Sequence, residues 1–190
     1  MVATEPIRDK KQIRQLAEYF FLKKQFRNYA LIVLGVCTAL RISDLLRMTW
    51  NDVYDKQRKA FYSHVTVVER KTGKTKVVAL NKQALKALRL YFPQRAGDYI
   101  FSNNRKKPQA ISRVQAWRIV KAAVAALRIR GKIALHSLRK SMAYHAWLSG
   151  KASPVVIMDI LNHNSYETTR RYLGVAQDER DAVYLGLTLF

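Results

Sequence analysis

His136-Ser137-Leu138-Arg139 and Leu161-Asn162-His163 lie in the last third of the chain, and Tyr172 follows His163 by nine residues. Arg41, in the segment Ala39-Leu40-Arg41-Ile42-Ser43-Asp44, adds a second guanidinium to this set. Two guanidiniums, two imidazoles and a phenol are the groups needed to hold a phosphodiester and to attack it with a tyrosine. The ordered set therefore predicts phosphate chemistry, whereas each residue alone has weak specificity.

The chemistry of phosphodiester cleavage assigns these residues candidate roles. Arg41 and Arg139 are suited to clamp the non-bridging oxygens, because a guanidinium grips two oxygens and keeps its charge. His136 precedes Arg139 by three residues across the start of a predicted helix, a spacing that places both side chains on one face. The backbone N–H groups at such a helix start also attract phosphate. Tyr172 is the candidate nucleophile.

A glycine-containing connection predicts a β-hairpin that carries a further basic residue. Arg70-Lys71-Thr72-Gly73-Lys74 separates two runs of β-branched and aromatic residues, Ala60 to Glu69 and Lys76 to Leu80. Lys71, at the expected tip, is positioned to protonate the leaving 5′-oxygen as a general acid. On spacing alone, any of the four basic residues between positions 70 and 76 is an equal candidate.

Structural interpretations compete with the catalytic ones. Arg41 alone is more simply explained as an ion-pair partner of Asp44. His136 is compatible with an ordinary histidine at a helix start, and His163 with a hydrogen-bonded histidine in a turn. Tyr172 is one of ten tyrosines, and Tyr166 lies only six residues before it.

The charge of the chain predicts a polyanionic partner. Its 190 residues suffice for one domain with a core, and 35 Lys and Arg against 13 Asp and Glu give a formal net charge of +22. Each cation placed on a phosphate releases a condensed counterion, so binding should be strong and sensitive to salt. Charge alone also allows RNA or a membrane surface as the partner.

Several other classes of protein are disfavoured. Cys37 is the only cysteine, which excludes an internal disulfide and fits a reducing cytoplasm. The apolar run from Leu31 to Leu40 is shorter than the ~20 residues of a membrane span, and the N-terminus has no apolar signal core. The four histidines lack metal-ligand spacing and no phosphate-binding glycine loop is present, so neither a metal nor a cofactor is expected.

Periodicity and capping residues predict a mostly helical α+β fold with a small antiparallel sheet. Helical spacing covers Ile13 to Phe20, a segment from about Asn28, and a segment from about Ser112 to Arg128. Other helix starts are predicted at Ser43, Asn81, Ser137, Ser153 and Ser165. The tail from Gln177 to Phe190 is expected to form one more amphipathic helix.

The same segments resemble the signature boxes of the tyrosine recombinases, the phage integrase family. The resemblance rests on residues 38–46, 136–140 and 161–173, in the right order and at the right separations. It implies an α+β, mostly helical catalytic domain in which Arg41 and Arg139 are the arginine pair and His136 and His163 the box histidines. Lys71 in Lys71-Thr72-Gly73 matches the hairpin lysine of the family, and Tyr172 matches the nucleophile.

The resemblance also implies a reaction and an assembly. The family cuts one strand of double-stranded DNA at a time, forms a 3′-phosphotyrosine and rejoins the free 5′-hydroxyl to a partner strand. Four protomers act through a Holliday junction, and the C-terminal segment docks on a neighbour. We therefore expect a cytoplasmic site-specific recombinase or integrase, encoded by a bacterium, phage or mobile element, that forms a homo-tetramer on DNA through residues 177–190.

Two departures from the family pattern leave alternatives open. Lys140 stands where many members have histidine. Residues 1–190 are expected to be a single catalytic domain without the usual N-terminal core-binding domain, either as an excised fragment or as a natural minimal recombinase. A type IB topoisomerase would use the same attack but reseal the original strand, and an accessory protein would bind DNA without cutting it.

Overall fold

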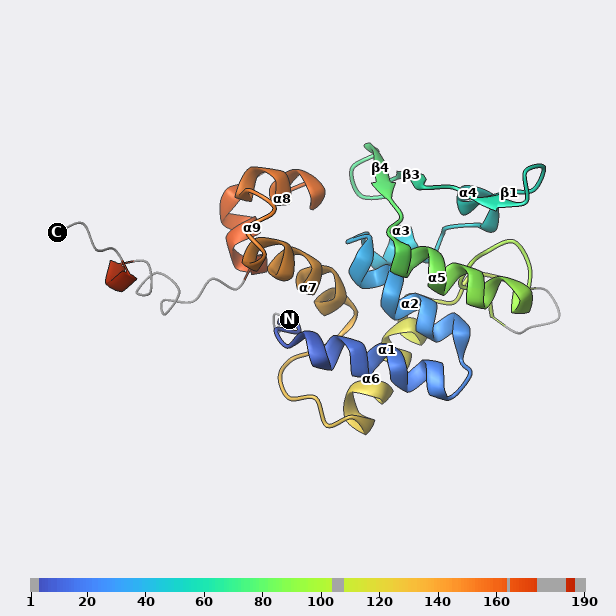
Figure 1. Ribbon diagram of the computed structural model, residues 1–190, viewed down its shortest axis with the longest axis horizontal. Helices are drawn as coiled ribbons and strands as arrows, with labels where there is room; N and C mark the ends of the chain where they lie inside the picture. Colours follow the sequence, from blue (N-terminus) through green and yellow to red (C-terminus); the bar gives the residue numbers. More distant parts are fainter. Residues whose placement is uncertain (1–3, 104–107, 164, 174–183, 187–190) are drawn as a thin grey trace.

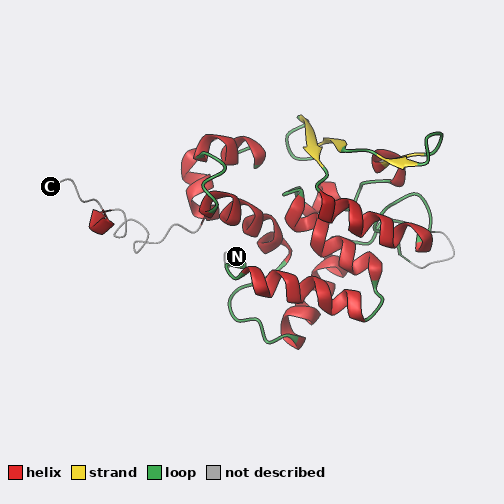
Figure 2. Cartoon of the chain, viewed as in Figure 1, coloured by secondary structure: helices red, strands yellow, loops and turns green. Residues whose placement is uncertain are grey.

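The computed structural model describes residues 4–103, 108–163, 165–173 and 184–186, and these form two neighbouring groups of helices beside two small β-hairpins (Figures 1 and 2). The larger group contains α1 (Lys10–Leu22), α2 (Phe26–Cys37), α5 (Lys82–Tyr91) and α6 (Arg113–Ala126). The second group contains α7 (Leu135–Leu148), α8 (Pro154–Ile160) and α9 (Tyr166–Leu173). Short elements α3 (Ile42–Leu45), α4 (Trp50–Val53) and η1 (Phe92–Gln94) connect the rest.

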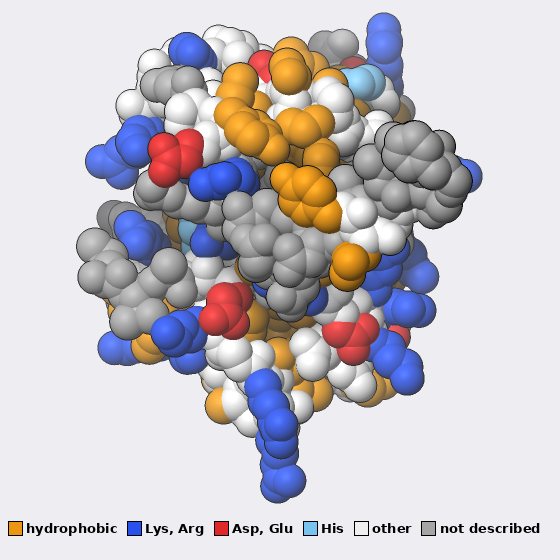
Figure 3. All heavy atoms as spheres, turned by 90° about the vertical axis from the view of Figure 1, so that its left-hand side faces the viewer, with side chains coloured by type: hydrophobic (Ala, Val, Ile, Leu, Met, Phe, Trp, Pro, Cys, Tyr) orange, Lys and Arg blue, Asp and Glu red, His pale blue; other side chains and the backbone are white. Residues whose placement is uncertain are grey.

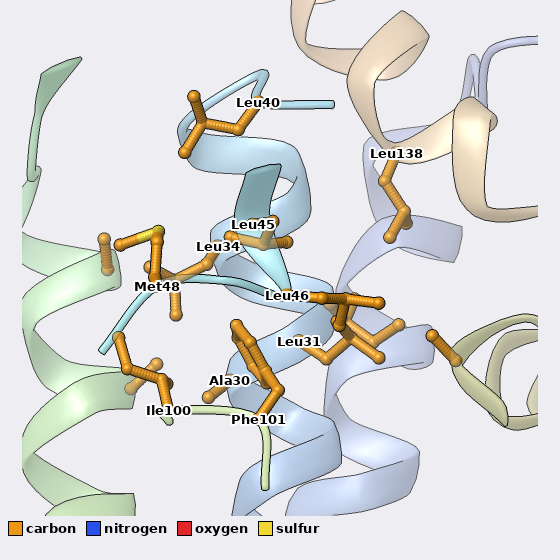
Figure 4. Close-up of a cluster of buried hydrophobic side chains, with 14 of the residues drawn as sticks. Ala30, Leu31, Leu34, Leu40, Leu45, Leu46, Met48, Ile100, Phe101 and Leu138 are labelled. Carbon is orange, nitrogen blue, oxygen red and sulfur yellow. The ribbon is translucent and has the colours of Figure 1, made fainter. Parts of the chain in front are cut away.

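Helix α2 is the centre of the larger core, because it is apolar along most of its length and packs against α1, α5 and α7. Its Ala30, Leu31 and Leu34 are fully buried, and Figure 4 shows Ala30 and Leu31 beside Phe101. Gly35 lets α7 approach closely, since a Cβ there would lie 2.8 Å from the Leu138 Cδ1 atom. This contact therefore helps to set the position of α7, which carries two of the predicted site residues.

The predicted β-hairpin is confirmed over a shorter range. Strands β3 (His64–Val68) and β4 (Thr75–Ala79) pair antiparallel, and Gly73 adopts the left-handed conformation in the turn, with φ +68°. The predicted run from Ala60 to Glu69 is divided, because β2 (Ala60–Phe61) pairs with β1 (Tyr54–Asp55) instead. The chain bends at residues 62 and 63 between the two pairs.

The helix starts that depend on a side-chain cap are confirmed at Asn81, Ser112 and Ser153. Each side chain accepts a hydrogen bond from the backbone N–H three residues later. The short helix predicted to begin at Ser165 is also present, as α9.

The capping predictions for Ser43 and Ser137 are wrong. Arg41, with extended backbone, precedes α3, and the Ser43 hydroxyl donates to the Asp44 carboxylate instead of capping the helix. Helix α7 begins two residues before Ser137, whose hydroxyl accepts from the Ala134 N–H. Ser137 is thus the third residue of the helix, the position that Glu or Gln takes in a capping box, and its hydroxyl accepts from the N-cap backbone.

The predicted C-terminal amphipathic helix, residues 177–190, lies outside the described residues except for positions 184–186. Within the part of the chain that the structure describes, no helix has the length and apolar character that a membrane span requires.

Candidate active site

Arg139 joins the segments that carry Arg41 and His163. It projects from α7 and is only 2% exposed. Its Nη1 donates to the Ala39 carbonyl oxygen over 2.5 Å, and its Nη2 donates to the Leu161 carbonyl oxygen. Because one guanidinium bonds to both backbone segments, the structure brings the first two sequence boxes and the third together at one place.

Arg41 pairs with Glu69 rather than with Asp44, which corrects the simpler interpretation of its sequence context. Its Nη1 lies 2.5 Å from the Glu69 Oε2 atom, and 19% of its side chain remains exposed. Asp44 instead accepts from the Arg70 backbone N–H at 3.1 Å. Arg41 precedes α3 with extended backbone, and its guanidinium meets Glu69, the residue that directly follows β3.

Glu69 is the one acidic side chain that the described contacts place against Arg41. Its Oε2 atom also accepts from the Thr72 hydroxyl, at 2.9 Å, and from the Asn162 side-chain amide. Burial acts to raise the pKa of Glu69, but the hydrogen bonds from Asn162 and Thr72 and the Arg41 charge outweigh it. The pKa of Glu69 therefore lies below its usual value, and the carboxylate is ionised near neutral pH.

The two predicted histidines face the same group of cations. His136 lies in the first turn of α7, and His163 follows the turn after α8, where its Nδ1 is 3.1 Å from the Thr169 hydroxyl. Burial and then the Arg139 charge lower the pKa of each imidazole to about 4. Both rings are therefore neutral at pH 7 and are available to exchange a proton or a hydrogen bond with a bound anion.

Tyr172 is placed on helix α9, which packs against α7 and α8. Its side chain is outside the described part of the structure. Position 172 is three residues after Thr169, which is fully buried and contacts His163.

Of the hairpin lysines, Lys76 rather than Lys71 lies among the site charges. Lys71 is exposed at the β3–β4 turn. Lys76 is half-buried, and its Nζ donates to the Ile160 carbonyl oxygen at the end of α8. Burial, followed by the Arg139 charge, lowers the pKa of Lys76 to about 8. The described contacts therefore place Lys76 beside the site charges and Lys71 at the exposed hairpin turn.

Sequence reasoning missed Glu69, Asn162 and Thr169 as members of the site. A signal for Glu69 was present, because β3 alternates strictly and places Val65, Val67 and then position 69 on its buried face. An acidic residue in such a register position requires a buried partner. Asn162, with φ +47°, is a left-handed residue in the α8–α9 connection, and sequence alone does not indicate its partner.

Lys140, the departure from the family pattern, bonds to the N-terminal segment, and its charge also contributes to the lowered pKa of His136. Its Nζ donates to the Thr4 carbonyl oxygen at 2.6 Å. The Ile7 backbone bonds to Ser141 and His145 of the same helix. The N-terminal segment is therefore tied along α7, the helix that carries His136 and Arg139.

The described residues offer a cluster of hydrogen-bond donors suited to an oxyanion. No group of three or more His, Cys, Asp or Glu side chains in the described ranges is arranged to hold a metal ion. The charges instead come from Arg41, Arg139 and Lys76, opposed by the carboxylate of Glu69 and, at Lys76, also by that of Asp159. Such fixed cations can stabilise the charge that develops on a pentacoordinate phosphorus.

Comparison with known proteins agrees with this geometry. The family model described as "Phage integrase family" matches residues 8–179. The chain is 34% identical over 186 residues to the probable integrase/recombinase YoeC of Bacillus subtilis, with 97% of each chain covered. It is 29% identical over 167 residues to the tyrosine recombinase XerD of Corynebacterium glutamicum, covering 84% of this chain and 52% of XerD.

Solved structures share the fold. The XerA recombinase superposes with a TM-score of 0.75 at 23% identity, covering 97% of this chain and 66% of XerA. A lambda integrase dimer bound to a COC′ core site superposes with a TM-score of 0.68 at 18% identity, covering 95% of this chain and 50% of the integrase. The chain thus spans nearly all of YoeC but about half of the XerD and lambda integrase chains.

Proposed function

The chain belongs to the phage integrase family of site-specific tyrosine recombinases, and on that premise we propose that its site cuts and rejoins DNA through Tyr172. The phenol oxygen attacks the phosphorus of one strand, forming a 3′-phosphotyrosine and breaking the bond to the 5′-oxygen. The free 5′-hydroxyl of a partner strand then attacks the phosphotyrosine and releases the enzyme. The observation that carries the proposal is the Arg139 bridge, which gathers the three sequence boxes at one place.

The two arginines stabilise the transition state. Negative charge grows on the non-bridging oxygens as the phosphorus becomes pentacoordinate, and fixed guanidiniums meet it without reorganisation. Arg139 is already anchored by two carbonyls, and Arg41 is held from one side by Glu69 while part of it stays exposed. A phosphodiester bound between them would therefore meet cations whose positions are set before DNA arrives.

The histidines and a hairpin lysine transfer the protons of the reaction. His136 and His163 are neutral before DNA binds, so they can accept the proton of the phenol or bond to the phosphate. Lys71 protonates the leaving 5′-oxygen, which requires the hairpin tip to reach the phosphate in the DNA complex. Lys76 is the competing candidate for that role, because it already lies beside the site charges.

Double-stranded DNA is the proposed partner. The net charge of +22 supplies the electrostatic attraction, and Lys and Arg side chains are distributed over the face that Figure 3 shows. The XerH recombinase bound to its palindromic difH substrate shares the fold, with a TM-score of 0.75 at 17% identity. Affinity should fall steeply with added salt, because each phosphate contact releases a counterion. The relatives YoeC and XerD are bacterial proteins, so we propose that the reaction takes place in the cytoplasm, where bacterial DNA lies.

We propose that the protein acts as a homo-tetramer on DNA, with the segment 177–190 of one protomer docking on the next. An exposed apolar surface supports this proposal. Leu148, Val155, Val156 and Tyr166 are each about half exposed or more on α7, α8 and α9. Figure 3 shows hydrophobic side chains gathered on the upper part of this end of the molecule. Residues 1–190 are proposed to be one catalytic domain.

Trapping the covalent intermediate tests the proposed reaction. A pool of duplexes with a randomised centre, each nicked in one strand, is incubated with the protein and then denatured. The nick lets the cleaved end diffuse away, so a recombinase accumulates as a protein–DNA adduct. Sequencing of the trapped DNA identifies the target, and mass spectrometry of the adduct should place the nucleotide on Tyr172.

Matched tyrosine variants make the result specific. Tyr172→Phe should abolish the adduct and leave DNA affinity within about two-fold, because only the nucleophilic oxygen is lost. Tyr166→Phe removes the same atom from the same helix, six residues away, and should leave the adduct unchanged. A wild-type protein that binds the DNA pool but never forms an adduct would overturn the enzymatic proposal. Relaxation of supercoiled plasmid without sequence preference would indicate the topoisomerase alternative instead.

A further inference from the structure

We propose that Glu69 is a positioning residue of the strand-cleavage reaction, and that its carboxylate holds Arg41, the β3–β4 hairpin turn and the α8–α9 connection in one arrangement. The inference rests on the proposed function and adds to it a residue outside the six predicted catalytic positions. Glu69 is fully buried at the end of β3.

One oxygen of Glu69 makes all of the contacts. Oε2 meets the Arg41 Nη1 atom at 2.5 Å, the Thr72 hydroxyl at 2.9 Å and the Asn162 amide. The Asn162 amide also donates to the Thr72 hydroxyl at 3.3 Å. The other oxygen, Oε1, is buried and has no hydrogen-bond partner in the described structure. A buried carboxylate with this distribution is held in one orientation by its three partners.

Each partner is, or directly adjoins, a predicted catalytic residue. Arg41 is bound directly, Thr72 follows Lys71, and Asn162 precedes His163. The backbone of Asn162 is left-handed, with φ +47°, which is a strained conformation for most residues. The Asn162 side-chain bonds to Glu69 and Thr72 help to hold that backbone, and with it the direction from which His163 leaves the turn.

The charge of Glu69 has a second consequence for Arg41. Arg41, Arg139 and Lys76 repel one another in the absence of a phosphate, and Glu69 is the carboxylate that offsets this repulsion at Arg41. Its Oε2 atom lies 2.5 Å from Nη1 and so holds one side of the guanidinium. The rest of the guanidinium is then presented in a set orientation to an incoming phosphodiester. Removing the charge while keeping the shape should disturb cleavage more than DNA affinity.

The test compares Glu69→Gln with wild type on the DNA recovered in the trapping experiment. Glutamine retains an oxygen that can accept from Thr72 and Asn162 but loses the charge that pairs with Arg41. We expect DNA affinity within about three-fold of wild type and single-turnover cleavage slower by roughly 30-fold or more, a loss of orientation at the transition state. Glu18→Gln, an exposed substitution on α1 with the same change in net charge, is the matched control and should cleave normally.

A spectroscopic readout separates positioning from a general effect on stability. The Glu69 charge acts to raise the pKa of His163, and it is not among the charges given for His136. Glu69→Gln should therefore lower the titration midpoint of His163 in the free protein by more than that of His136, as followed by imidazole NMR signals. This measurement needs no DNA and does not depend on activity.

Two further variants test the role of Glu69 if the Glu69→Gln protein does not fold. Thr72→Val removes the hydroxyl that bonds to Glu69, Lys74 and Asn162. Asn162→Gly removes the amide that bonds to Glu69 and Thr72, while glycine tolerates the positive φ. Each should slow cleavage several-fold with little change in affinity. Wild-type-like cleavage in Glu69→Gln, or in both of these variants, would overturn the role of Glu69. Absence of an adduct with wild type would instead reject the proposed function itself.

Discussion

The guanidinium of Arg139 donates to the carbonyl of Ala39, with 2.5 Å between Nη1 and the oxygen, and so ties α7 to the segment that leads into Arg41. Ala39 is fully buried and has φ +50°, a left-handed conformation that costs a non-glycine residue roughly 1–2 kcal/mol. The bond helps to hold this conformation. Arg139 therefore organises the site before any phosphate is bound.

Replacing Arg139 should cost stability as well as activity. Arg139→Met leaves the buried carbonyls of Ala39 and Leu161 without their donor, which should lower the free energy of unfolding by about 2–4 kcal/mol. Urea denaturation measures this loss. The exposed Arg118→Met on α6 is the control and should change stability by less than about 0.5 kcal/mol. Equal stability of the two variants would show that Arg139 has no structural role.

The two site histidines should titrate far below the usual range and respond to phosphate. The pKa of His136 and of His163 is about 4 in the free protein, against an ordinary value near 6.5. Inorganic phosphate or DNA offsets the repulsion from Arg139 and should raise both midpoints. Imidazole NMR signals assigned with His136→Gln and His163→Gln report the shift. Midpoints that stay the same when phosphate binds would place the anion elsewhere.

The same depressed values make stability depend on pH with a defined sign. Between pH 6.5 and about 4 these two histidines are protonated in the unfolded chain but remain neutral in the folded chain. Their contribution to stability is therefore intact above pH 6.5 and is lost progressively as the pH falls toward 4. Thermal denaturation of His136→Gln across this range should show a shallower acid dependence than wild type.

A substrate with a sulfur leaving group should distinguish the two hairpin lysines. Replacing the bridging 5′-oxygen by sulfur gives a leaving group that needs no proton. If Lys71 is the general acid, Lys71→Ala should cleave ordinary DNA at least ~100-fold slower and recover most of that loss with the sulfur substrate. Lys76→Ala should lose activity through weaker phosphate and α8 contacts, and should not recover. If the sulfur substrate restores cleavage only in Lys76→Ala, then Lys76 rather than Lys71 is the general acid.

Gly35→Ala should disturb the site from inside the core. The added Cβ would lie 2.8 Å from the Leu138 Cδ1 atom and 3.3 Å from its Cβ, forcing α2 and α7 apart. Overpacking of this kind costs about 1–3 kcal/mol and should also slow cleavage, because α7 carries His136 and Arg139. Adding Leu138→Ala to Gly35→Ala should cost less than the sum of the single changes. Strict additivity would show that the two residues do not meet.

The local elements could be predicted from the sequence because their causes are local. Asn81 and Ser153 cap helices through N–H groups three residues away, and Gly73 supplies the positive φ that the hairpin turn needs. Ser137 was misplaced because serine serves equally as a cap or as the third residue of the first turn. The strand pairing of Ala60 and Phe61 with residues 54 and 55 also escaped prediction, since period-two patterns do not reveal a change of partner.

The sequence alone determined which chemical groups are available to the proposed site, because the order and spacing of Arg41, His136, Arg139, His163 and Tyr172 are written in the chain. Only the tertiary structure decided how those groups are held. The Arg41–Glu69 pair spans 28 residues, and the bond from Arg139 to Ala39 spans 100. Burial and charge repulsion, which set the histidine and Lys76 pKa values, depend on such distant neighbours and arise only when the chain has folded.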